Sequence, residues 1–185
     1  MTGKTAFIAF GANQGNRQDF CDRAIALIKL LPHSKVIRVS SYYETEPVDM
    51  EDNPDDMWFY NGVIQIETNL RPENLLAICQ ETERSLGRNP GHRNRPRTID
   101  LDILFYGERI INTPQLAIPH PRLHKRRFVL VPMAELNPQW VHPQQHQTIQ
   151  TLLAQLTDTQ KIQKLDLVPG SHYHAKPPCS LPPTN

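Results

Sequence analysis

Hydrophobic and polar positions along the chain follow the period of a strand in some segments and the period of a helix in others. In residues 61–68, Ile64 and Ile66 share one face, while most positions of the other face are polar, as in a strand. In residues 20–31, apolar side chains recur every three or four positions and end before Pro32, as in a helix. The same criteria predict strands over residues 5–10, 35–43, 61–68 and 98–106, and helices over 20–31 and 72–86. This β-α-β-β-α-β order predicts an α+β fold with a ferredoxin-like split sheet.

Two connections in this order are longer than compact domains usually keep. Residues 44–58 are acidic and interrupted by prolines, whereas residues 88–97 carry four arginines and no acid. We expect both to be active-site loops. After the last core strand, the pattern predicts a short strand over 109–111 and extra C-terminal helices over 128–136 and 148–156.

The length of 185 residues is sufficient for one domain with one sizeable core. The last 17 residues contain five prolines and few large apolar side chains. We therefore expect a single catalytic domain over residues 1–160 and a Pro-rich, flexible tail over 161–185.

Composition narrows the functional classes. The net charge is +1 at pH 7, 38% of the residues are hydrophobic and the mean hydropathy is −0.51. No apolar run approaches the ~18–20 residues that cross a bilayer, and the first residues do not resemble a signal peptide. Three distant cysteines form neither a disulfide framework nor a zinc motif. We expect a cytoplasmic protein with no membrane or nucleic-acid partner.

Asp100 and Asp102 are the most informative candidates for chemistry. Both lie in the apolar run of residues 98–106, so strand alternation places them on one face, about 6.6 Å apart. Two carboxylates this close repel each other unless a cation joins them. Mg²⁺ prefers such oxygen ligands and completes its shell with waters and substrate phosphates. The alternative is a structural pair that forms salt bridges with nearby arginines.

The arginine-rich loop directly upstream makes nucleotide phosphates the favoured ligand, because guanidinium forks match phosphate geometry. The motifs of P-loop, Rossmann and serine-hydrolase proteins are absent. His120 and His124 have metal-compatible spacing but lack the glutamate of a zinc protease motif. Asn61 is a primary amide beside aromatic residues, and such a group can hydrogen-bond a flat heterocycle.

Several segments together carry a resemblance to one family. They are Gly11-x-Asn13-x-Gly15-Asn16, Ser41-x-Tyr43-x-Thr45-Glu46-Pro47, Phe59-Tyr60-Asn61, Gly87-Arg88, Arg97-Thr98-Ile99-Asp100-Leu101-Asp102-Ile103-Leu104, Pro119-His120-Pro121-Arg122 and Arg126-Arg127-Phe128-Val129-Leu130-x-Pro132. Over residues 4–158 the chain resembles the 6-hydroxymethyl-7,8-dihydropterin pyrophosphokinase family.

The resemblance implies an enzyme of folate biosynthesis that transfers pyrophosphate from ATP to the hydroxymethyl group of the pterin and releases AMP. It implies two Mg²⁺ ions held by Asp100 and Asp102, and a catalytic set that also contains Arg88 and Arg97. The positions that match nucleotide contacts are Gln80, Glu83, Arg88, Arg97, Ile103, His120 and Arg126. The positions that match the pterin pocket are Thr45, Val48, Phe59, Asn61 and Phe128, with the two phenylalanines placed to sandwich the ring.

The chain departs from the family pattern in two places. Asn94-Arg95 stands where many members have Trp-Gly, in an arginine loop one residue shorter than in some members, and the connection over 47–59 is longer and more acidic than usual. The length leaves no room for the aldolase or dihydropteroate synthase domains fused to some relatives, so we expect a monofunctional enzyme, and a monomer.

Two alternatives come from other classes. RNA-binding modules share the split sheet, but they need aromatic motifs on central strands, where this chain has two aspartates. A metal-dependent phosphohydrolase or nucleotidyltransferase would also use the aspartate pair. The product formed from ATP in the presence and absence of pterin distinguishes these alternatives.

Overall fold

The computed structural model describes residues 3–48, 57–88 and 97–170. Residues 49–56 and 89–96, which make up most of the two expected active-site loops, lie outside the described residues, as do the departures from the family pattern at Asn94 and Arg95.

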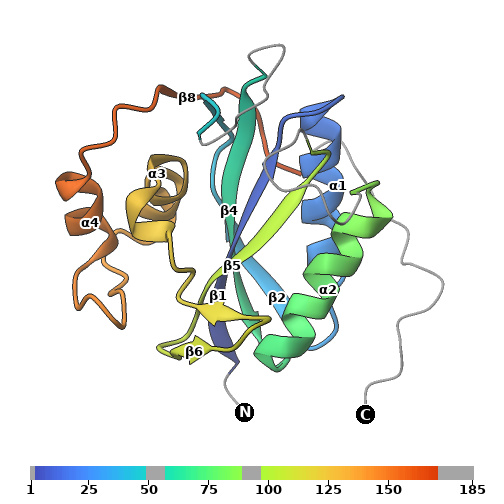
Figure 1. The fold of residues 1–185 in the computed structure, drawn as a ribbon. Coiled ribbons are helices and arrows are strands. Elements are labelled where there is room, and N and C mark those ends of the chain that lie inside the picture. Colours follow the sequence, from blue (N-terminus) through green and yellow to red (C-terminus); the bar gives the residue numbers. More distant parts are fainter. Residues whose placement is uncertain (1–2, 49–56, 89–96, 171–185) are drawn as a thin grey trace.

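A six-stranded antiparallel sheet forms the centre of the molecule (Figure 1). Its strands are β1 (Lys4–Ala12), β2 (Ser34–Val39), β3 (Tyr43–Thr45), β4 (Phe59–Thr68), β5 (Asp100–Tyr106) and β8 (Ile162–Lys164). They follow the order β5-β1-β4-β3-β8, and β2 pairs with the second half of β4 on the same edge as β3. A separate two-stranded sheet contains β6 (Ile111–Asn112) and β7 (Ala117–Ile118).

Helices cover both faces of this sheet and give three layers (Figure 1). One face carries α1 (Arg17–Lys29) and α2 (Pro72–Ser85), and the other carries α3 (Arg127–Leu136) and α4 (Ile149–Gln155). A short 3-10 helix at Leu123–Lys125 precedes α3. Over residues 3–48, 57–88 and 97–170, no helix has the length and apolar character needed to cross a membrane.

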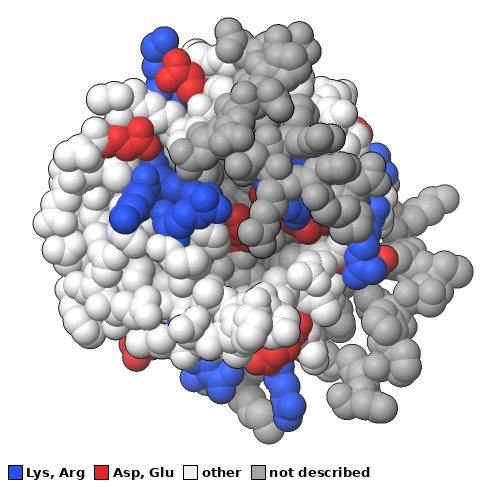
Figure 2. Space-filling model, viewed as in Figure 1, with Lys and Arg blue, Asp and Glu red and all other residues white. Residues whose placement is uncertain are grey.

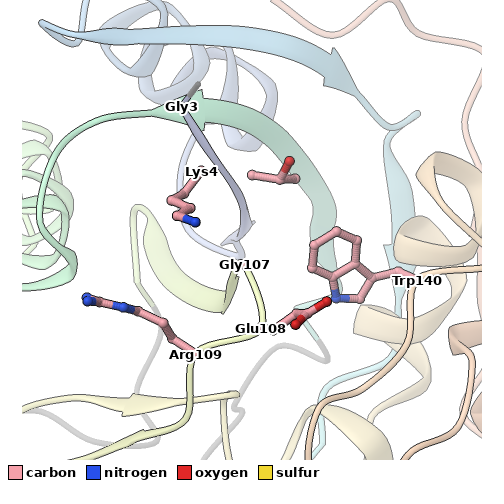
Figure 3. A pocket seen from close by; sticks show the side chains of 7 residues that line it. Gly3, Lys4, Gly107, Glu108, Arg109 and Trp140 are labelled. Atoms are coloured by element: carbon pink, nitrogen blue, oxygen red, sulfur yellow. The ribbon is translucent and has the colours of Figure 1, made fainter. Parts of the chain in front are cut away.

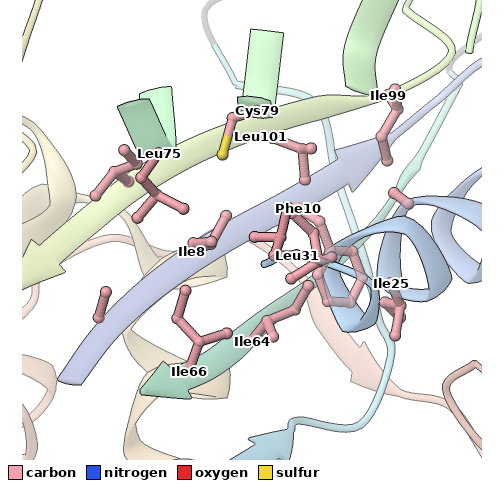
Figure 4. Packing of buried hydrophobic residues seen from close by; sticks show 14 of the residues in the cluster. Ile8, Phe10, Ile25, Leu31, Ile64, Ile66, Leu75, Cys79, Ile99 and Leu101 are labelled. Carbon is pink, nitrogen blue, oxygen red and sulfur yellow. The ribbon is translucent and has the colours of Figure 1, made fainter. Parts of the chain in front are cut away.

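Each face of the sheet has its own hydrophobic core, because successive strand residues point to opposite faces. On β1, Phe7 lies in the core under α3 and α4, whereas Ile8 lies in the core under α1 and α2. Figure 4 shows the second of these cores, in which side chains of both helices meet those of three strands. Its buried residues include Ile8, Phe10, Ile25, Ile64, Ile66, Leu75, Cys79, Ile99, Leu101 and Ile103. Ile99, Leu101 and Ile103 therefore lie in this core, and Asp100 and Asp102 share the opposite face, as strand alternation predicts.

The helix ends follow local chemistry in the sequence. The Asn16 side chain accepts a hydrogen bond from Asp19 N at 3.1 Å and so caps α1. Pro72 occupies the first turn of α2, where it needs no hydrogen-bond donor. Gly87 follows α2 with φ +87°, a conformation that glycine adopts without a Cβ clash. These signals explain why α1 and α2 agree with the predicted helices.

The strand expected over residues 35–43 is instead two strands, β2 and β3. Ser40 separates them: its N–H donates to Val63 O and its hydroxyl accepts from Val63 N, both at 2.9 Å. The side chain of Tyr42 is fully buried in the core under α1, where its hydroxyl donates to Asp22. A side-chain network therefore replaces part of the regular ladder, which alternation of residue types alone could not predict.

The described fold continues beyond the boundary expected at residue 160. β8 pairs with β3, and Leu165 and Leu167 pack against the core on the α1 and α2 face. Gly170 N then donates to Asp22 Oδ1 at 2.6 Å. This segment has too few apolar residues to be recognised by hydrophobic pattern. The rest of the expected tail, residues 171–185, lies outside the described residues.

Candidate active site

Four residues of the predicted site segments lie in one row across the sheet. Tyr43 of β3 pairs with Asn61 of β4, Asn61 pairs with Gly11 of β1, and Gly11 pairs with Asp100 of β5. Residues that pair directly across antiparallel strands present their side chains on the same face. Here it is the face covered by α3, because the Tyr43 hydroxyl donates to Glu135 of α3 at 2.8 Å. The strand spacing places Asn61 and Asp100 about 10 Å apart, on either side of Gly11.

Gly11 keeps the middle of this row free of side chain. A Cβ atom at this position would lie 2.5 Å from Asn61 Oδ1, a distance that real Cβ atoms do not adopt. The Asn61 amide is in turn oriented by Thr45, because Asn61 Nδ2 donates to Thr45 Oγ1 at 2.8 Å and both side chains are buried. Two predicted pterin-binding residues, of which Asn61 belongs to the row, are thus joined by a hydrogen bond.

Asp100 is paired with both predicted phosphate-binding arginines. Its Oδ1 atom lies 2.6 Å from Arg88 Nη1, and its Oδ2 atom lies 2.6 Å from Arg97 Nη1. Both guanidinium groups are partly exposed to solvent, so a phosphate can reach them. The structure therefore brings three of the four predicted catalytic residues together.

Glu83 supports this cluster from α2. Its Oε1 atom accepts a hydrogen bond from Leu101 N at 2.7 Å and also pairs with Arg88 Nη1. Burial, together with Asp100 nearby, raises the pKa of Glu83 to about 7, although Leu101 N and Arg88 act in the opposite direction. In this geometry the side chain positions Arg88 and the start of β5.

Asp102 lies two residues further along β5 on the same face, beside His120. The distance between His120 Nε2 and Asp102 Oδ2 is 4.0 Å, which is longer than a hydrogen bond. Burial and the charge of Asp100 raise the pKa of Asp102 to about 6. Burial and the cations Arg126 and Arg122 lower the pKa of His120 to about 4, so its imidazole is neutral at pH 7.

The aspartate pair fits a hard divalent cation in part. The pKa of Asp102 is raised first by burial and then by the charge of Asp100, and a bound cation would offset both effects. Within the described part of the chain, however, no group of three or more His, Cys, Asp or Glu side chains is arranged to hold a metal ion. Both oxygens of Asp100 also face arginines, so a metal held by Asp100 would have to replace at least one of these contacts. The remaining ligands would come from substrate phosphates and water.

Asn13 anchors the end of the arginine loop to β1. Its Oδ1 atom accepts from Arg97 N at 2.8 Å, and its N–H donates to Arg97 O at 3.2 Å. Asn13 is buried, so these bonds hold Arg97 next to Asp100. This segment is one of those that carry the family resemblance, and the bonds to Arg97 give its asparagine a structural role.

Arg17 is a residue near the site that the sequence analysis did not single out. Its Nη1 atom lies 2.9 Å from Glu44 Oε1 and donates to Trp58 O at 2.7 Å. The guanidinium carbon also lies 4.0 Å above the centre of the Tyr60 ring. Arg17 therefore joins both ends of the acidic connection to the first turn of α1. Local sequence gives no signal for contacts this distant along the chain.

The predicted aromatic pair lies at the ends of two elements. Phe59 begins β4, where it pairs with Thr45, and Phe128 lies in the first turn of α3. Both are half-buried, and the Arg126 guanidinium lies 5.3 Å from the Phe128 ring centre. A sandwich of a flat ring between the two phenylalanines stays a prediction.

Three further predicted residues differ in what they offer a ligand. Val48 is 43% exposed at the edge of the acidic connection, and Gln80 is exposed on α2. Ile103 is buried in the core under α1 and α2, so only its backbone could reach a nucleotide. Their predicted binding roles stay predictions.

The space-filling view shows one charged hollow on the face of the molecule that is turned to the viewer in Figure 1. Figure 2 shows acidic side chains near its middle, between Lys and Arg side chains on either side. A separate hollow of about 690 Å³ lies at the opposite end of β1 and β5, where Lys4, Gly107, Arg109 and Trp140 are among its lining residues (Figure 3). That hollow contains none of the predicted site residues and is not the candidate site.

Comparisons with known proteins identify a family for this chain. The profile of the family described as 7,8-dihydro-6-hydroxymethylpterin-pyrophosphokinase (HPPK) matches residues 7–138. A 2-amino-4-hydroxy-6-hydroxymethyldihydropteridine pyrophosphokinase of Bacillus subtilis is 44% identical over 131 residues, which are 71% of this chain and 77% of that protein. The Haemophilus influenzae protein of the same name is 38% identical over 158 residues, or 85% of this chain and 96% of that protein.

Longer proteins match as well. The folic acid synthesis protein fol1 of Schizosaccharomyces pombe is 40% identical over 153 residues, so this chain spans 83% of its own length but only 20% of that protein. A crystal structure of Plasmodium falciparum HPPK-DHPS with pteroate superposes with a TM-score of 0.65 at 16% identity, over 83% of this chain and 42% of that one. This similarity concerns the fold: a mixed α/β structure with an antiparallel sheet and helices. The resemblance noted in the sequence is confirmed, and the chain belongs to the 7,8-dihydro-6-hydroxymethylpterin-pyrophosphokinase family.

Proposed function

We propose that this chain transfers the pyrophosphoryl group of ATP to the hydroxymethyl group of 6-hydroxymethyl-7,8-dihydropterin and releases AMP, as a step of folate biosynthesis. Family membership supports this activity, and so does the name of the Haemophilus influenzae relative, of which the chain covers 96%. The proposal includes a monomeric enzyme that acts in the cytoplasm without a nucleic-acid partner. It also includes the ferredoxin-like class of the sheet, supported by the strand order β5-β1-β4-β3.

One observation carries the proposal: the row across the sheet places Asn61 and Asp100 on the same face, on either side of Gly11. An amide suited to a heterocycle thus lies about 10 Å from a carboxylate and arginine cluster suited to phosphates. A small alcohol held at Asn61 and a nucleotide held near Asp100 would meet over Gly11, where no side chain intervenes. Positioning of this kind is the main requirement of phosphoryl-type transfer.

On the nucleotide side, Asp100 and Asp102 would hold Mg²⁺, with two ions proposed. Bound Mg²⁺ neutralises phosphate charge and orients the transferred group. Arg88 and Arg97 donate to phosphate oxygens from the positions in which they now contact Asp100. His120, neutral at pH 7, can donate a hydrogen bond without adding charge. Gln80, Glu83, Ile103 and Arg126 complete the proposed nucleotide contacts.

On the pterin side, Asn61 and Thr45 bind the heterocycle through hydrogen bonds. Their mutual hydrogen bond fixes the amide orientation before the ligand arrives, which reduces the entropy cost of binding. Phe59 and Phe128 would cover the two faces of the ring, and Val48 would lie at its edge. All of these side chains are uncharged, which suits an uncharged heterocycle.

A single assay tests the proposal. The protein is incubated with Mg²⁺ and ATP, with and without hydroxymethyl-dihydropterin, and nucleotide products are separated. AMP that appears only when pterin is present supports the proposed transfer. ADP or phosphate released without pterin would contradict it and support a phosphohydrolase, and omission of Mg²⁺ in a parallel reaction tests the metal requirement.

A further inference from the structure

The described residues after position 160 contact the elements that carry the proposed pterin pocket. We name residues 160–170 the C-terminal strap. It begins beside β3, runs along this strand as β8 and then passes to α1, as Figure 1 shows at the red end of the described chain. Its other end reaches Asp22 of α1 through Gly170.

The strap completes the hydrogen bonding of β3. This strand has only three residues, and it carries Thr45, which orients the Asn61 amide. β4 pairs with one edge of β3, and β8 pairs with the other. Without the strap, the outer edge of β3 would lose these partners, and a short edge strand has little independent stability.

The strap also holds the residue after β3. Gln160 Nε2 donates to Glu46 O at 2.5 Å, and Lys161 N donates to Glu46 Oε2 at 3.0 Å. Lys161 Nζ lies 3.0 Å from Glu46 Oε1, and Glu46 N donates to Lys161 O at 3.2 Å. Four contacts therefore fix the backbone directly after Thr45.

The hydrogen-bond ladder between β3 and β8 contains a position at which the role of the strap can be tested. Glu46 N donates to Lys161 O, and Leu165 N donates to Tyr42 O at 2.9 Å. Hydrogen-bonded pairs alternate in an antiparallel ladder, so Gln163, which pairs with Glu44, is a hydrogen-bonded position. Its side chain is exposed. A change at this position can therefore remove a ladder bond without disturbing the core.

The far end of the strap is linked through Asp22 of α1 to the residue that precedes β3. Asp22 Oδ1 accepts from both the Tyr42 hydroxyl and Gly170 N. Tyr42 directly precedes β3, so the strap holds the strand at both of its ends. Lys164 lies 3.4 Å from Glu135, the residue that accepts the hydrogen bond of the Tyr43 hydroxyl.

We propose that the C-terminal strap is a positioning element for the pterin: it sets pterin affinity by fixing β3, and therefore Thr45 and Asn61, while leaving nucleotide affinity unchanged. The inference rests on the proposed function. The effect should be selective for the pterin because the strap residues 160–170 contact β3, Glu46, Glu135 and α1 and, among the described residues, form no hydrogen bond or ion pair with Asp100.

The test compares Gln163→Pro with Gln163→Ala. Proline removes the N–H of residue 163, whereas alanine removes only the exposed side chain and serves as the matched control. In the full chain, Gln163→Pro should raise the KM for hydroxymethyl-dihydropterin about fivefold, the equivalent of one lost hydrogen bond. The KM for ATP and kcat should stay within about twofold of the wild type, and Gln163→Ala should match the wild type in all three.

The outcomes separate the inference from the proposed function. If the wild-type protein forms no pterin-dependent AMP, the proposed function fails. If the wild type is active but Gln163→Pro leaves the pterin KM unchanged, or raises both KM values equally, the strap has no selective role. Should Gln163→Pro not fold, Gln160→Ala decides the question: it removes the donor to Glu46 O, and an unchanged pterin KM overturns the proposal, whereas a selective rise supports it.

Discussion

The two ends of the row across the sheet are held in place by different forces. The carboxylate of Asp100 forms ion pairs with partners close in the sequence, since Arg97 lies three positions and Arg88 twelve positions away. Around β3 several contacts are hydrogen bonds between distant segments. The Tyr43 hydroxyl donates to Glu135 over a separation of 92 positions, and the Gln160 amide reaches Glu46 over 114.

This difference determines how each side responds to a ligand or a substitution. Partly exposed ion pairs contribute little to stability and can exchange partners, so a phosphate can replace Asp100 as a partner of Arg88 or Arg97. Asn61 and Thr45 cannot exchange partners in this way, because breaking their buried hydrogen bond leaves polar atoms unpaired. We therefore expect changes on the nucleotide side to affect turnover, and changes on the pterin side to affect binding.

The largest effect is expected at Asp102. Asp102→Asn removes a carboxylate that we propose as a metal ligand and that repels Asp100, so turnover should fall about a thousandfold while the melting temperature holds or rises. AMP formation and thermal unfolding measure the two effects, and Glu67→Gln at an exposed position of β4 is the control. A variant that melts much lower but keeps its turnover would show that Asp102 is structural.

A smaller loss is expected at Arg97. Arg97→Ala leaves Asp100 with Arg88 alone, and kcat should fall about a hundredfold because one stabilising donor to the transferred group is lost. Arg97→Lys keeps the charge without the planar fork and should recover part of the rate. Steady-state kinetics with each substrate varied measures both. A selective rise in the pterin KM of Arg97→Ala would contradict the separation between the two sides.

Much of the arrangement around Asp100 could be predicted from sequence because its signals are local. Strand alternation placed Asp100 and Asp102 on one face, and the structure has their neighbours in the core on the other. Arg97, three positions from Asp100, pairs with it. Charge and period within a short segment are sufficient for such inferences.

The arrangement around β3 could be predicted only in part. The residue types at Thr45 and Asn61 were recognisable, but not the strap that fixes them, because β8 has no hydrophobic pattern and pairs with a strand more than a hundred positions earlier. Arg17 was missed for the same reason: its partners Glu44 and Trp58 lie far along the chain. The split between β2 and β3 depends on the hydroxyl of Ser40, which no period reveals.

A moderate, selective effect is expected at Asn61. Asn61→Ala removes the amide and leaves Thr45 Oγ1 without this donor, at a cost of roughly 1–3 kcal/mol, or about fivefold to 150-fold in pterin affinity. ATP affinity should change by less than about twofold, because the nucleotide side does not depend on this bond. Titration of each ligand separately, monitored by pterin fluorescence and by calorimetry, measures the ratio. Equal weakening of both ligands would mean that Asn61 only stabilises its strand.

The smallest effect concerns the pH dependence of folding, in which the two sides should differ in sign. Burial raises the pKa of Glu83 to about 7, above the value of about 4.3 in an unfolded chain. Its contribution to stability is therefore lost as the pH rises towards about 7. For Glu135, burial acts to raise the pKa, but hydrogen bonds from Tyr43 and Ser41 outweigh it and lower the pKa. Its contribution is present above about 4.3 and is lost as the pH falls through the folded value.

Melting curves of Glu83→Gln and Glu135→Gln between acid and neutral pH separate these contributions. In acid, Glu83→Gln should melt at nearly the same temperature as the wild type. Near neutral pH it should melt at a higher temperature than the wild type, because glutamine can still accept a hydrogen bond from Leu101 N but carries no buried charge. At neutral pH, Glu135→Gln should melt at a lower temperature than the wild type, because it lacks the carboxylate that accepts hydrogen bonds from Ser41 and Tyr43. In acid the two melting temperatures should converge, because a protonated Glu135 accepts these hydrogen bonds less strongly than the anion does. Each kcal/mol corresponds to roughly 2–4 °C in a protein of this size. If the melting temperatures of the two variants changed with pH in the same way, the comparison would be contradicted. The region around Asp100 and the region around β3 would then respond to protonation alike.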